Sequence, residues 1–335
     1  MLHLILTRIA LTLPLMLGAS FITFAILYFV PGDPVIMMLG DRANDEALVK
    51  KMRAELRLDE PFYMRYGRFL GGLTHGDLGR SYRTNRLISQ DLKETLPATL
   101  ELAAAGLALS IIIGIASGLF SAMKQYSLVD YGFMLLALVG VSIPVFWLAL
   151  MLSYFFAFKH PIFEMTGRLG GDFMDYQPRT GLILVDAIWD RDWELLRNAL
   201  MHLVLPATTL GLIGSALIAR MTRSSVLEVK TQDFVRTARA KGLNARQVLR
   251  HIIRNALLPI ITVVGLQFGA LLGGAIITEE IFAWPGIGTY LIQAIRYRDI
   301  VAVQGTVMMV VVLFLGVNLV VDLMYAAVDP RTRTA

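Results

Sequence analysis

Six long apolar blocks constrain the fold of this chain more than any other feature. They cover approximately residues 9–30, 98–123, 131–158, 199–219, 256–278 and 303–328. A helix of about 20 apolar residues crosses the roughly 30 Å hydrocarbon core of a bilayer, so every block is long enough to span it. Because lipid offers no partner to the backbone groups of an open strand, we expect each block to be helical. The sequence therefore predicts an all-α integral membrane protein with six transmembrane helices.

The composition supports this class and excludes others. Hydrophobic residues make up 56% of the chain and charged residues 17%, whereas soluble domains average about 45–50% and about 25%. The formal net charge of +5 is modest, so we predict no nucleic-acid partner. The chain has no cysteine, which rules out disulfides and thiolate metal sites. We expect the first block to be a retained helix, because it is too long for the apolar core of a signal peptide and no clear A-x-A cleavage site follows it.

The charge of the loops predicts the orientation. Residues 220–255 carry nine Lys and Arg side chains against two acidic ones, Glu228 and Asp233. Such an excess of Lys and Arg marks a cytosolic loop. With six spans, both termini then lie in the cytosol, and Arg331 and Arg333 in the C-terminal tail agree with this.

The domain organisation follows from the same blocks. We predict an N-terminal transmembrane helix over 1–31, a periplasmic helical segment over 32–97, a transmembrane core over 98–328 and a cytosolic tail over 329–335. In the periplasmic segment, we expect Asn44 to cap a helix that begins at Asp45, and Pro61 to begin a second helix. Two interpretations of this segment stay open: a small cap over the outer mouth of the bundle, or a docking surface for an external protein.

The segment Gln232–Pro259 is basic and amphipathic and lies between two apolar blocks. Its first part predicts a short helix over Asp233–Lys241, which Gly242 ends in left-handed backbone. We expect Asn244 to cap a second short helix, and Pro259 to lie in the first turn of the next membrane helix. A loop that only held anionic lipid headgroups would need charge but no defined break. The pattern therefore favours a protein-docking helix over a lipid-binding loop.

This segment resembles the cytosolic coupling loop of type I ABC importer permeases, which contacts a separate ATP-binding subunit in that family. Arg236-Thr237-Ala238 stands where the family pattern has Glu-Ala-Ala, Gly242 is its glycine, and Leu258-Pro259 is its later Leu-Pro. The Leu-Pro comes several residues later than in sugar permeases. The glutamate of the pattern is absent, as expected of the peptide and nickel branch of the family.

Other motifs resemble the same branch, and they extend from one end of the chain to the other. They are Val30-Pro31-Gly32-Asp33-Pro34, Gly76-Asp77-Leu78-Gly79-x-Ser81, Leu96-Pro97-Ala98-Thr99-Leu100-Glu101-Leu102, Arg220-Met221-Thr222-Arg223-Ser224-Ser225, Phe282-x-Trp284-Pro285-Gly286-Ile287-Gly288 and Asp329-Pro330-Arg331. Taken together, they look most like those of dipeptide permeases, with oligopeptide, glutathione and nickel permeases as close relatives.

The resemblance implies a MetI-like permease fold in the bacterial inner membrane and a role in ATP-driven, binding-protein-dependent import of dipeptides or short peptides. Nickel, glutathione and haem remain alternative substrates. Besides membrane lipid, the implied partners are a homologous second permease, two P-loop ATPase subunits that use ATP and Mg, and a periplasmic peptide-binding protein. The residues that the resemblance and the local pattern assign to coupling with the ATPase subunits are Asp233, Phe234, Arg236, Thr237, Ala238, Lys241, Gly242, Leu258 and Pro259.

The sequence lacks the motifs of an ATPase or a metalloprotease. It has no G-x-x-x-x-G-K-[ST] loop, no Gly-Lys dipeptide and no H-E-x-x-H, and its five histidines are scattered through different segments. We therefore predict no catalytic residues, no metal site and no cofactor bound by this chain. The alternative from another class is an ion-coupled secondary transporter, which would place several ionisable groups near the membrane midplane. This sequence is poor in such groups.

Five residues of the apolar blocks are candidates for helix packing or for a translocation path: Gly265, Gly269, Gly273, Glu101 and Asp322. The glycines are spaced four apart, so a helix of this chain or of a partner permease could approach them closely. The two acidic residues lie near block ends, which favours structural pairing over substrate contact. Outside the blocks, we expect Trp284 to anchor at the lipid headgroups.

Overall fold

The computed structural model describes residues 2–29 and 34–328. Within these ranges the chain forms helices and no β-strand, and a single antiparallel bridge joins Arg80 to Leu87. The predicted all-α class is confirmed. The motif that begins at Val30 lies outside the described residues up to Asp33, and so does the predicted tail over 329–335.

Five helices in the described ranges are long and apolar enough to cross a membrane. They are α1 (Leu2–Phe29), α5 (Ile88–Met123), α9 (Trp193–Lys230), α11 (Ala245–Ile281) and α13 (Ile300–Val328). Each overlaps one of the predicted apolar blocks. Several extend well beyond their block: α9 has 38 residues, or about 57 Å at 1.5 Å per residue, whereas the hydrocarbon core is about 30 Å thick.

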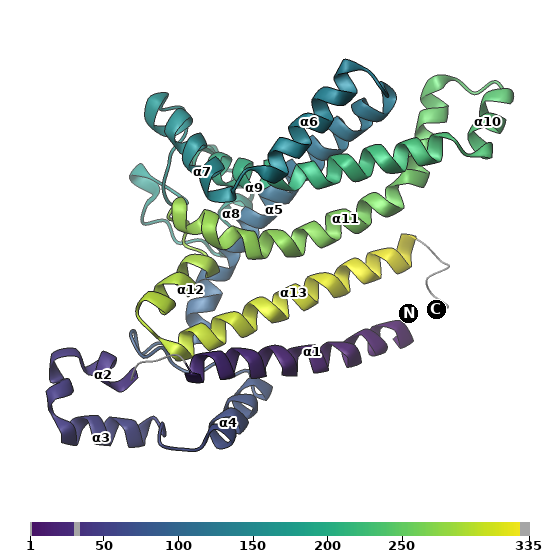
Figure 1. Cartoon of the computed structure of the whole chain (residues 1–335). Helices are drawn as coiled ribbons and strands as arrows, with labels where there is room; N and C mark the ends of the chain where they lie inside the picture. The colour runs from purple at the N-terminus through teal and green to yellow at the C-terminus, as the bar shows by residue number, and fades with distance from the viewer. Residues whose placement is uncertain (1, 30–33, 329–335) are drawn as a thin grey trace. The chain divides into compact units, whose positions relative to one another are not determined.

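The block over residues 131–158 forms two helices instead of the expected single one. α6 (Leu128–Ser142) and α7 (Val145–Ser153) meet at a bend of 103°, and a π-helical turn, η2 (Tyr154–Lys159), continues α7. Ile143 is extended between them, because a following proline disfavours helical backbone at the residue before it. Figure 1 shows the two helices diverging from this bend. The prediction of one uninterrupted helix here is wrong, and the described ranges hold five spans, or six if the bent pair is one span.

Shorter helices lie between the long apolar ones. They are α2 (Pro34–Leu39), α3 (Glu46–Glu55), α4 (Phe62–Thr74), α8 (Ile183–Asp190), α10 (Asp233–Ala240) and α12 (Ile287–Arg296), with 3-10 turns η1 (Gly40–Asn44) and η3 (Gly171–Phe173). The cap of α3 is one residue later than predicted. The Asp45 carboxylate accepts hydrogen bonds from the N–H groups of Ala47 and Leu48 at 3.0 and 3.1 Å, and Asn44 belongs to the preceding turn.

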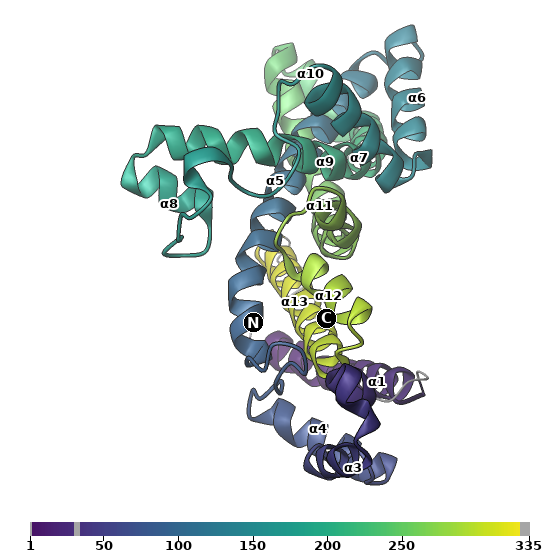
Figure 2. The same ribbon diagram turned by 90° about the vertical axis from the view of Figure 1, so that its left-hand side faces the viewer.

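Contacts divide the chain into two compact units. Among the described residues, the core unit comprises 97–285 and 316–328. In it, α9 packs against α11, α6 and α7, and Figures 1 and 2 both show α9 and α11 side by side. α5 also approaches α9 closely: a Cβ added at Gly114 would lie 2.7 Å from the Cβ of Ile218. Small residues therefore bring helices of this unit together, as they commonly do in membranes.

The N-terminal unit comprises Leu2–Leu96 and Gly286–Leu315. Its buried centre is formed by apolar residues of the start of α5, of α12 and of the start of α13, including Ile88, Leu92 and Ile287. A separate aromatic cluster joins α4 to α1, where Phe24 contacts Phe62 and other aromatic rings. α4 is thereby attached to α1, whereas α3 has no buried residue.

Candidate functional site

α10 is a short helix with a sharply defined end. The backbone of Gly242 is left-handed, with φ of +81°, as predicted. The N–H of Gly242 donates to the carbonyl of Arg239 at 2.9 Å, and the N–H of Leu243 donates to that of Ala238 at 3.2 Å. This pair of bonds is the Schellman arrangement, which satisfies the last carbonyls of a helix. The helix therefore stops at a fixed point, where a residue with a side chain would be strained.

The next helix begins directly after this turn. The Asn244 side chain accepts from the N–H of Gln247 at 2.9 Å, and the Gln247 side chain accepts from the N–H of Asn244 at 3.0 Å. This reciprocal capping box fixes the first residue of α11. From there α11 continues for 37 residues with Pro259 in its interior. The prediction that Pro259 begins a separate membrane helix is wrong, because the predicted second short helix and the membrane span form one continuous helix.

One face of α10 holds it in place. Val235 is 1% exposed and joins a buried cluster with Val226 of α9 and with Val248 and Ile252 of α11. Leu258 and Pro259, further along α11, are partly buried. α10 is therefore attached to the core unit by apolar contacts along a single side.

The other face of α10 points away from the protein. Its exposed residues are Asp233, Phe234, Arg236, Thr237 and Lys241, while Ala238 is partly buried. The side chains of Asp233 and Arg236 are 96% and 80% exposed and lie 3.7 Å apart. A phenylalanine that is 37% exposed beside cationic side chains gives this face the composition of a protein-docking surface.

A groove of about 590 Å³ lies at the base of α10. Its walls are mainly apolar side chains of α9 and α11, with Lys230, Arg239 and Arg246 among its lining residues and no acidic residue. The surface around α10 is thus positive and apolar together, and it suits an acidic partner with apolar side chains.

A buried ion pair connects three helices close to this surface. The Arg223 guanidinium of α9 donates two hydrogen bonds to the Asp130 carboxylate in the first turn of α6, both at 2.7 Å. Asp130 also accepts from the hydroxyl of Ser121 and from the N–H of Tyr126. The side chain of Asp130 is 2% exposed. Paired bidentate geometry of this kind stabilises a buried carboxylate and fixes its neighbours.

Glu101 is structurally paired, as expected. Its carboxylate accepts from the N–H of Leu184 at 2.8 Å and forms an ion pair with Arg168. Both charged side chains are nearly buried, with 6% and 9% exposed. Arg168 also donates to the carbonyl of Gly181 at 2.9 Å. Glu101 therefore connects α5 to the first turn of α8 and to the segment before it.

Trp284 contradicts the prediction of a headgroup anchor. It is 1% exposed and belongs to the buried cluster of the core unit. Its indole N–H donates to the carbonyl of Ala98 at 2.8 Å, so the turn after α11 folds the ring against the start of the apolar part of α5. A buried indole with a satisfied N–H is a packing residue.

Comparisons with known proteins agree with the sequence motifs. A family described as "Binding-protein-dependent transport system inner membrane component" matches residues 114–334, and its N-terminal family matches residues 1–103. The chain belongs to this permease family. It is therefore a multi-pass inner-membrane component of a binding-protein-dependent transport system.

Individual relatives of this permease are similar over almost their whole length. It is 43% identical over 337 residues to the dipeptide transport system permease protein DppB of Alkalihalophilus pseudofirmus, covering 97% of this chain and 98% of that protein. It is 42% identical to the DppB protein of Escherichia coli K12, covering 99% of both chains. It is 43% identical to the di/tripeptide permease DppB of Pseudomonas aeruginosa, again covering 99% of both.

The glycine stripe of the permease serves at least one helix of its own chain. A Cβ added at Gly265 would lie 2.5 Å from a methyl group of Val321 in α13, so this glycine allows close packing within the core unit. Gly269 is buried, whereas Gly273 is exposed and no atom of the described part of the chain lies within 4 Å of its Cβ position. Asp322 lies in α13, but its side chain is outside the described part of the structure.

Sequence reasoning did not identify Glu279 of the permease as a buried acidic residue. Glu279, just past the predicted end of the fifth block, is fully buried and accepts a hydrogen bond from Thr99 at 2.6 Å. The signal was available in Thr278-Glu279-Glu280, where two acids follow an apolar stretch directly. Acids at such a boundary are expected to be paired or hydrated, and the sequence does not say which.

Proposed function

We propose that this chain is the membrane-spanning permease subunit of an ATP-driven, binding-protein-dependent importer of dipeptides or other short peptides. The sequence has no P-loop, so two partner ATPase subunits would use the ATP and Mg. A homologous second permease would complete the path, and an external peptide-binding protein would deliver the substrate. The substrate class follows the names of the relatives, which are dipeptide and di/tripeptide permeases. Nickel, glutathione and haem are the alternative substrates within the family.

The proposed orientation places α10 in the cytosol. The nine Lys and Arg residues over 220–255 support it. The chain then crosses the membrane six times, with the α6–α7 pair counted as one crossing, and both termini lie in the cytosol. The segment before α5 lies on the outer side in this arrangement.

The proposal rests mainly on how α10 is attached to the core unit. It is a short helix with defined ends, seated by one apolar face and displaying Phe234 and Arg236 on the other. It leads through Gly242 and the cap at Asn244 into α11, whose 37 residues extend about 55 Å. A displacement of α10 would therefore pass along one rigid helix into the membrane. For ATP to drive such a change, the ATPase subunits must bind the outward- and inward-open states with different affinity.

The second permease has a candidate contact surface on the same helix. Gly273 is exposed and no side chain of the described residues lies within 4 Å of its Cβ position, so this part of the glycine stripe is available to a helix of the partner subunit. Glu101, in contrast, is already paired within the chain and is assigned to structure.

Site-specific cross-linking tests the role of α10. The chain has no native cysteine, so a single introduced cysteine is a unique probe. In the assembled complex, Arg236→Cys is expected to cross-link to an ATPase subunit, with a yield that changes when ATP is added. Gln125→Cys is the matched control, because Gln125 is exposed in the turn between α5 and α6 on the same predicted side of the membrane. Cross-links at the control position alone would contradict the assignment.

Reconstitution tests the function itself. Liposomes that contain this chain, the second permease and both ATPase subunits should take up a labelled dipeptide when the binding protein and ATP are present. Omission of any one of these components should abolish uptake. Uptake by this chain alone, driven by an ion gradient without ATPase subunits, would instead support a secondary transporter.

A further inference from the structure

α4 contacts α1 inside its apolar stretch rather than at its end. The span of α1, Leu11–Phe29, has 19 residues and extends about 28 Å, close to the thickness of the hydrocarbon core, about 30 Å. Phe24 is 4% exposed and lies five residues before the end of this span, or about 7 Å inside it. Three rings of α4 have centres 5.3, 5.4 and 5.7 Å from that of Phe24: Phe62, Tyr66 and Phe69. α4 therefore crosses α1 below the boundary of the hydrocarbon.

The hydroxyl of Tyr66 reaches the middle of the same span. It forms a hydrogen bond of 3.0 Å with the hydroxyl of Ser20, which is nine residues from either end of the span. Ser20 is 1% exposed and donates to the carbonyl of Leu17 at 2.8 Å. The two hydroxyls thus satisfy each other without water, as polar groups in hydrocarbon must.

Another edge of α4 carries two arginines, and it lies at the level of the boundary. The guanidinium of Arg65 is 5.3 Å from the ring centre of Tyr28, one residue before the end of the span. Arg68 pairs with Glu60, just before the helix. The helix is therefore oriented with its arginine edge toward the headgroups and with Tyr66 toward the acyl chains.

The side of α4 that faces away from α1 is apolar and open. Tyr63 is 68% exposed and Met64 is 52% exposed, and no atom of the described chain lies within 4 Å of the Cβ position of Gly67. The neighbouring surface of α1 has the same character, with Ile22 and Ile26 58% and 60% exposed. α1 is a span of a multi-pass membrane protein, so lipid covers this surface of α1. The apolar side of α4 continues it.

The C-terminal end of α4 needs no water for its backbone. The N–H of Gly76 donates to the carbonyl of Leu73 at 3.1 Å, and the N–H of Asp77 donates to that of Gly72 at 2.9 Å. This is a Schellman arrangement, which satisfies the last carbonyls of the helix internally. Such an end suits a site with little water, where an unsatisfied carbonyl is costly.

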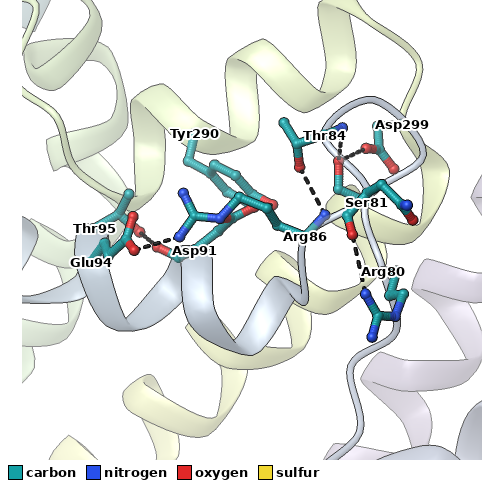
Figure 3. A network of polar contacts seen from close by, with 10 residues as sticks. Arg80, Ser81, Thr84, Arg86, Asp91, Glu94, Thr95, Tyr290 and Asp299 are labelled. Atoms are coloured by element: carbon teal, nitrogen blue, oxygen red, sulfur yellow. Dashed lines mark hydrogen bonds and ion pairs between the residues drawn. The ribbon is translucent and has the colours of Figure 1, made fainter.

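The chain after α4 returns directly to the boundary of the membrane. A Cβ added at Gly79 would lie 2.6 Å from a methyl group of Val301, in the first turn of α13, where its apolar span begins. Figure 3 shows the loop that follows fixed there, with the hydroxyl of Ser81 donating to the buried Asp299 carboxylate at 2.6 Å. Five residues of chain after Thr74 reach at most about 17 Å. The end of α4 therefore stays close to the boundary level.

We infer that α4 is embedded in one leaflet of the membrane, which is the outer leaflet in the proposed orientation. With about 3.6 residues per turn, Tyr63 and Leu70 lie on the Tyr66 side of the helix, among the acyl chains, while Arg65 and Arg68 lie at the headgroups. Helices of this kind bury their apolar face about 5–10 Å into the headgroup–acyl boundary. The segment that precedes α5 is therefore partly a lipid-bound element.

A soluble protein is the competing occupant of the exposed side of α4. α3 shows how a water-facing helix of the same segment is built, because it has no buried residue and exposes Glu46, Lys50 and Lys51. α4 exposes tyrosine and methionine instead and has no acidic residue. A soluble protein on the Tyr63 side would have to enter the hydrocarbon, since Tyr66 on that side already reaches the middle of α1.

Spin labels at single cysteines test the depth of α4. The chain has no native cysteine, so each variant carries one label. The chain is purified with its co-expressed partner subunits in lipid nanodiscs, and the access of O2 and of a water-soluble nickel complex to each label is measured. Labels at Tyr63→Cys and Met64→Cys should be reached by O2 and shielded from nickel, at depths of about 5–10 Å. Lys51→Cys on α3 is the control in water, and Ile26→Cys on α1 is the control in lipid.

The three environments give different results. The Tyr63 label should lie deeper than the Met64 label, because Tyr63 is on the side of α4 that faces the acyl chains. Nickel access equal to that of the Lys51 label would place α4 in water and overturn the inference. Shielding of the α4 labels from both reagents would show that a protein covers them, which would overturn it as well.

The depth measurement does not depend on transport. If the α4 labels lie in water and the complex takes up peptide, the inference about α4 fails and the proposed function stands. If the labels lie in lipid and the complex with all its partners moves no peptide, the proposed function fails and the position of α4 stands.

Discussion

Two neighbouring regions of the core unit hold their helices together in opposite ways. Around Asp130, three helices meet at a buried carboxylate that accepts hydrogen bonds from Ser121, Tyr126 and Arg223. At α10, a short helix is held by Val235 and its apolar neighbours and by two turns that satisfy the backbone. The first region resists relative movement of its helices, whereas the second leaves α10 attached along one face. We therefore interpret the region around Asp130 as a rigid frame and α10 as the moving part that transmits movement.

The largest expected effect is the loss of the buried ion pair. Asp130→Ala removes the partner of Arg223, and we expect the free energy of unfolding to fall by about 3 kcal/mol, because a cation is left without its carboxylate in a mostly buried site. Thermal unfolding of the purified protein in detergent measures this change. Asp190→Ala, which breaks the exposed pair with Arg179, is the control and should cost less than about 1 kcal/mol. Equal losses in the two variants would remove the distinction between frame and moving part.

The next effect concerns movement and leaves the frame intact. Gly242→Val places a β-branched residue at φ of +81°, at a local cost of about 1–3 kcal/mol. We expect the complex to assemble and insert normally, while ATP-dependent peptide uptake falls by about tenfold, since the end of α10 is distorted. Gly242→Asn is the matched control, because asparagine tolerates left-handed backbone, and it should keep most of the uptake. Full uptake in the valine variant would show that this turn does not transmit force.

A smaller effect is expected at the start of α11. Asn244→Ala removes the side-chain half of the capping box with Gln247 and should destabilise the helix end by about 1 kcal/mol. Hydrogen exchange of the first amides of α11 should increase, while exchange around Asp130 stays unchanged. Increased exchange at both places would mean that the two regions are coupled and open together.

The sequence alone predicts the features that are determined by residues close to one another along the chain. The apolar blocks became helices because length and hydropathy decide this in lipid, and Gly242 and Asn244 end and begin helices through local backbone chemistry. The break between α6 and α7 was harder to predict. Pro144 follows it, but Pro14, Pro97, Pro206 and Pro259 all lie inside unbroken helices. Proline alone therefore does not decide where a membrane helix breaks.

Features that depend on tertiary contacts could not be read from the sequence. The sequence places Arg223 in a basic loop, but in the structure it lies in α9 and binds Asp130, 93 residues earlier in the chain. The residue type of Trp284 predicts a position at the membrane surface, but the fold buries this side chain, and its indole N–H donates to the carbonyl of Ala98. In both cases the residue type allowed two environments, and the choice depended on a distant partner.

The variant with the smallest expected effect on stability tests most directly whether α10 docks an ATPase subunit. Arg236→Ala removes a side chain that is 80% exposed, so the free energy of unfolding should change by less than about 0.5 kcal/mol. If the outer face of α10 docks an ATPase subunit, the same change should weaken binding of that subunit by about fivefold to tenfold, because arginine is often a major contributor to interfaces. Arg250→Ala, an exposed arginine on α11 outside α10, is the control and should affect neither quantity. The affinity of the ATPase subunit for both variants, measured in detergent, separates the outcomes. Equal affinities of the two variants would contradict a docking role for Arg236 on the exposed face of α10.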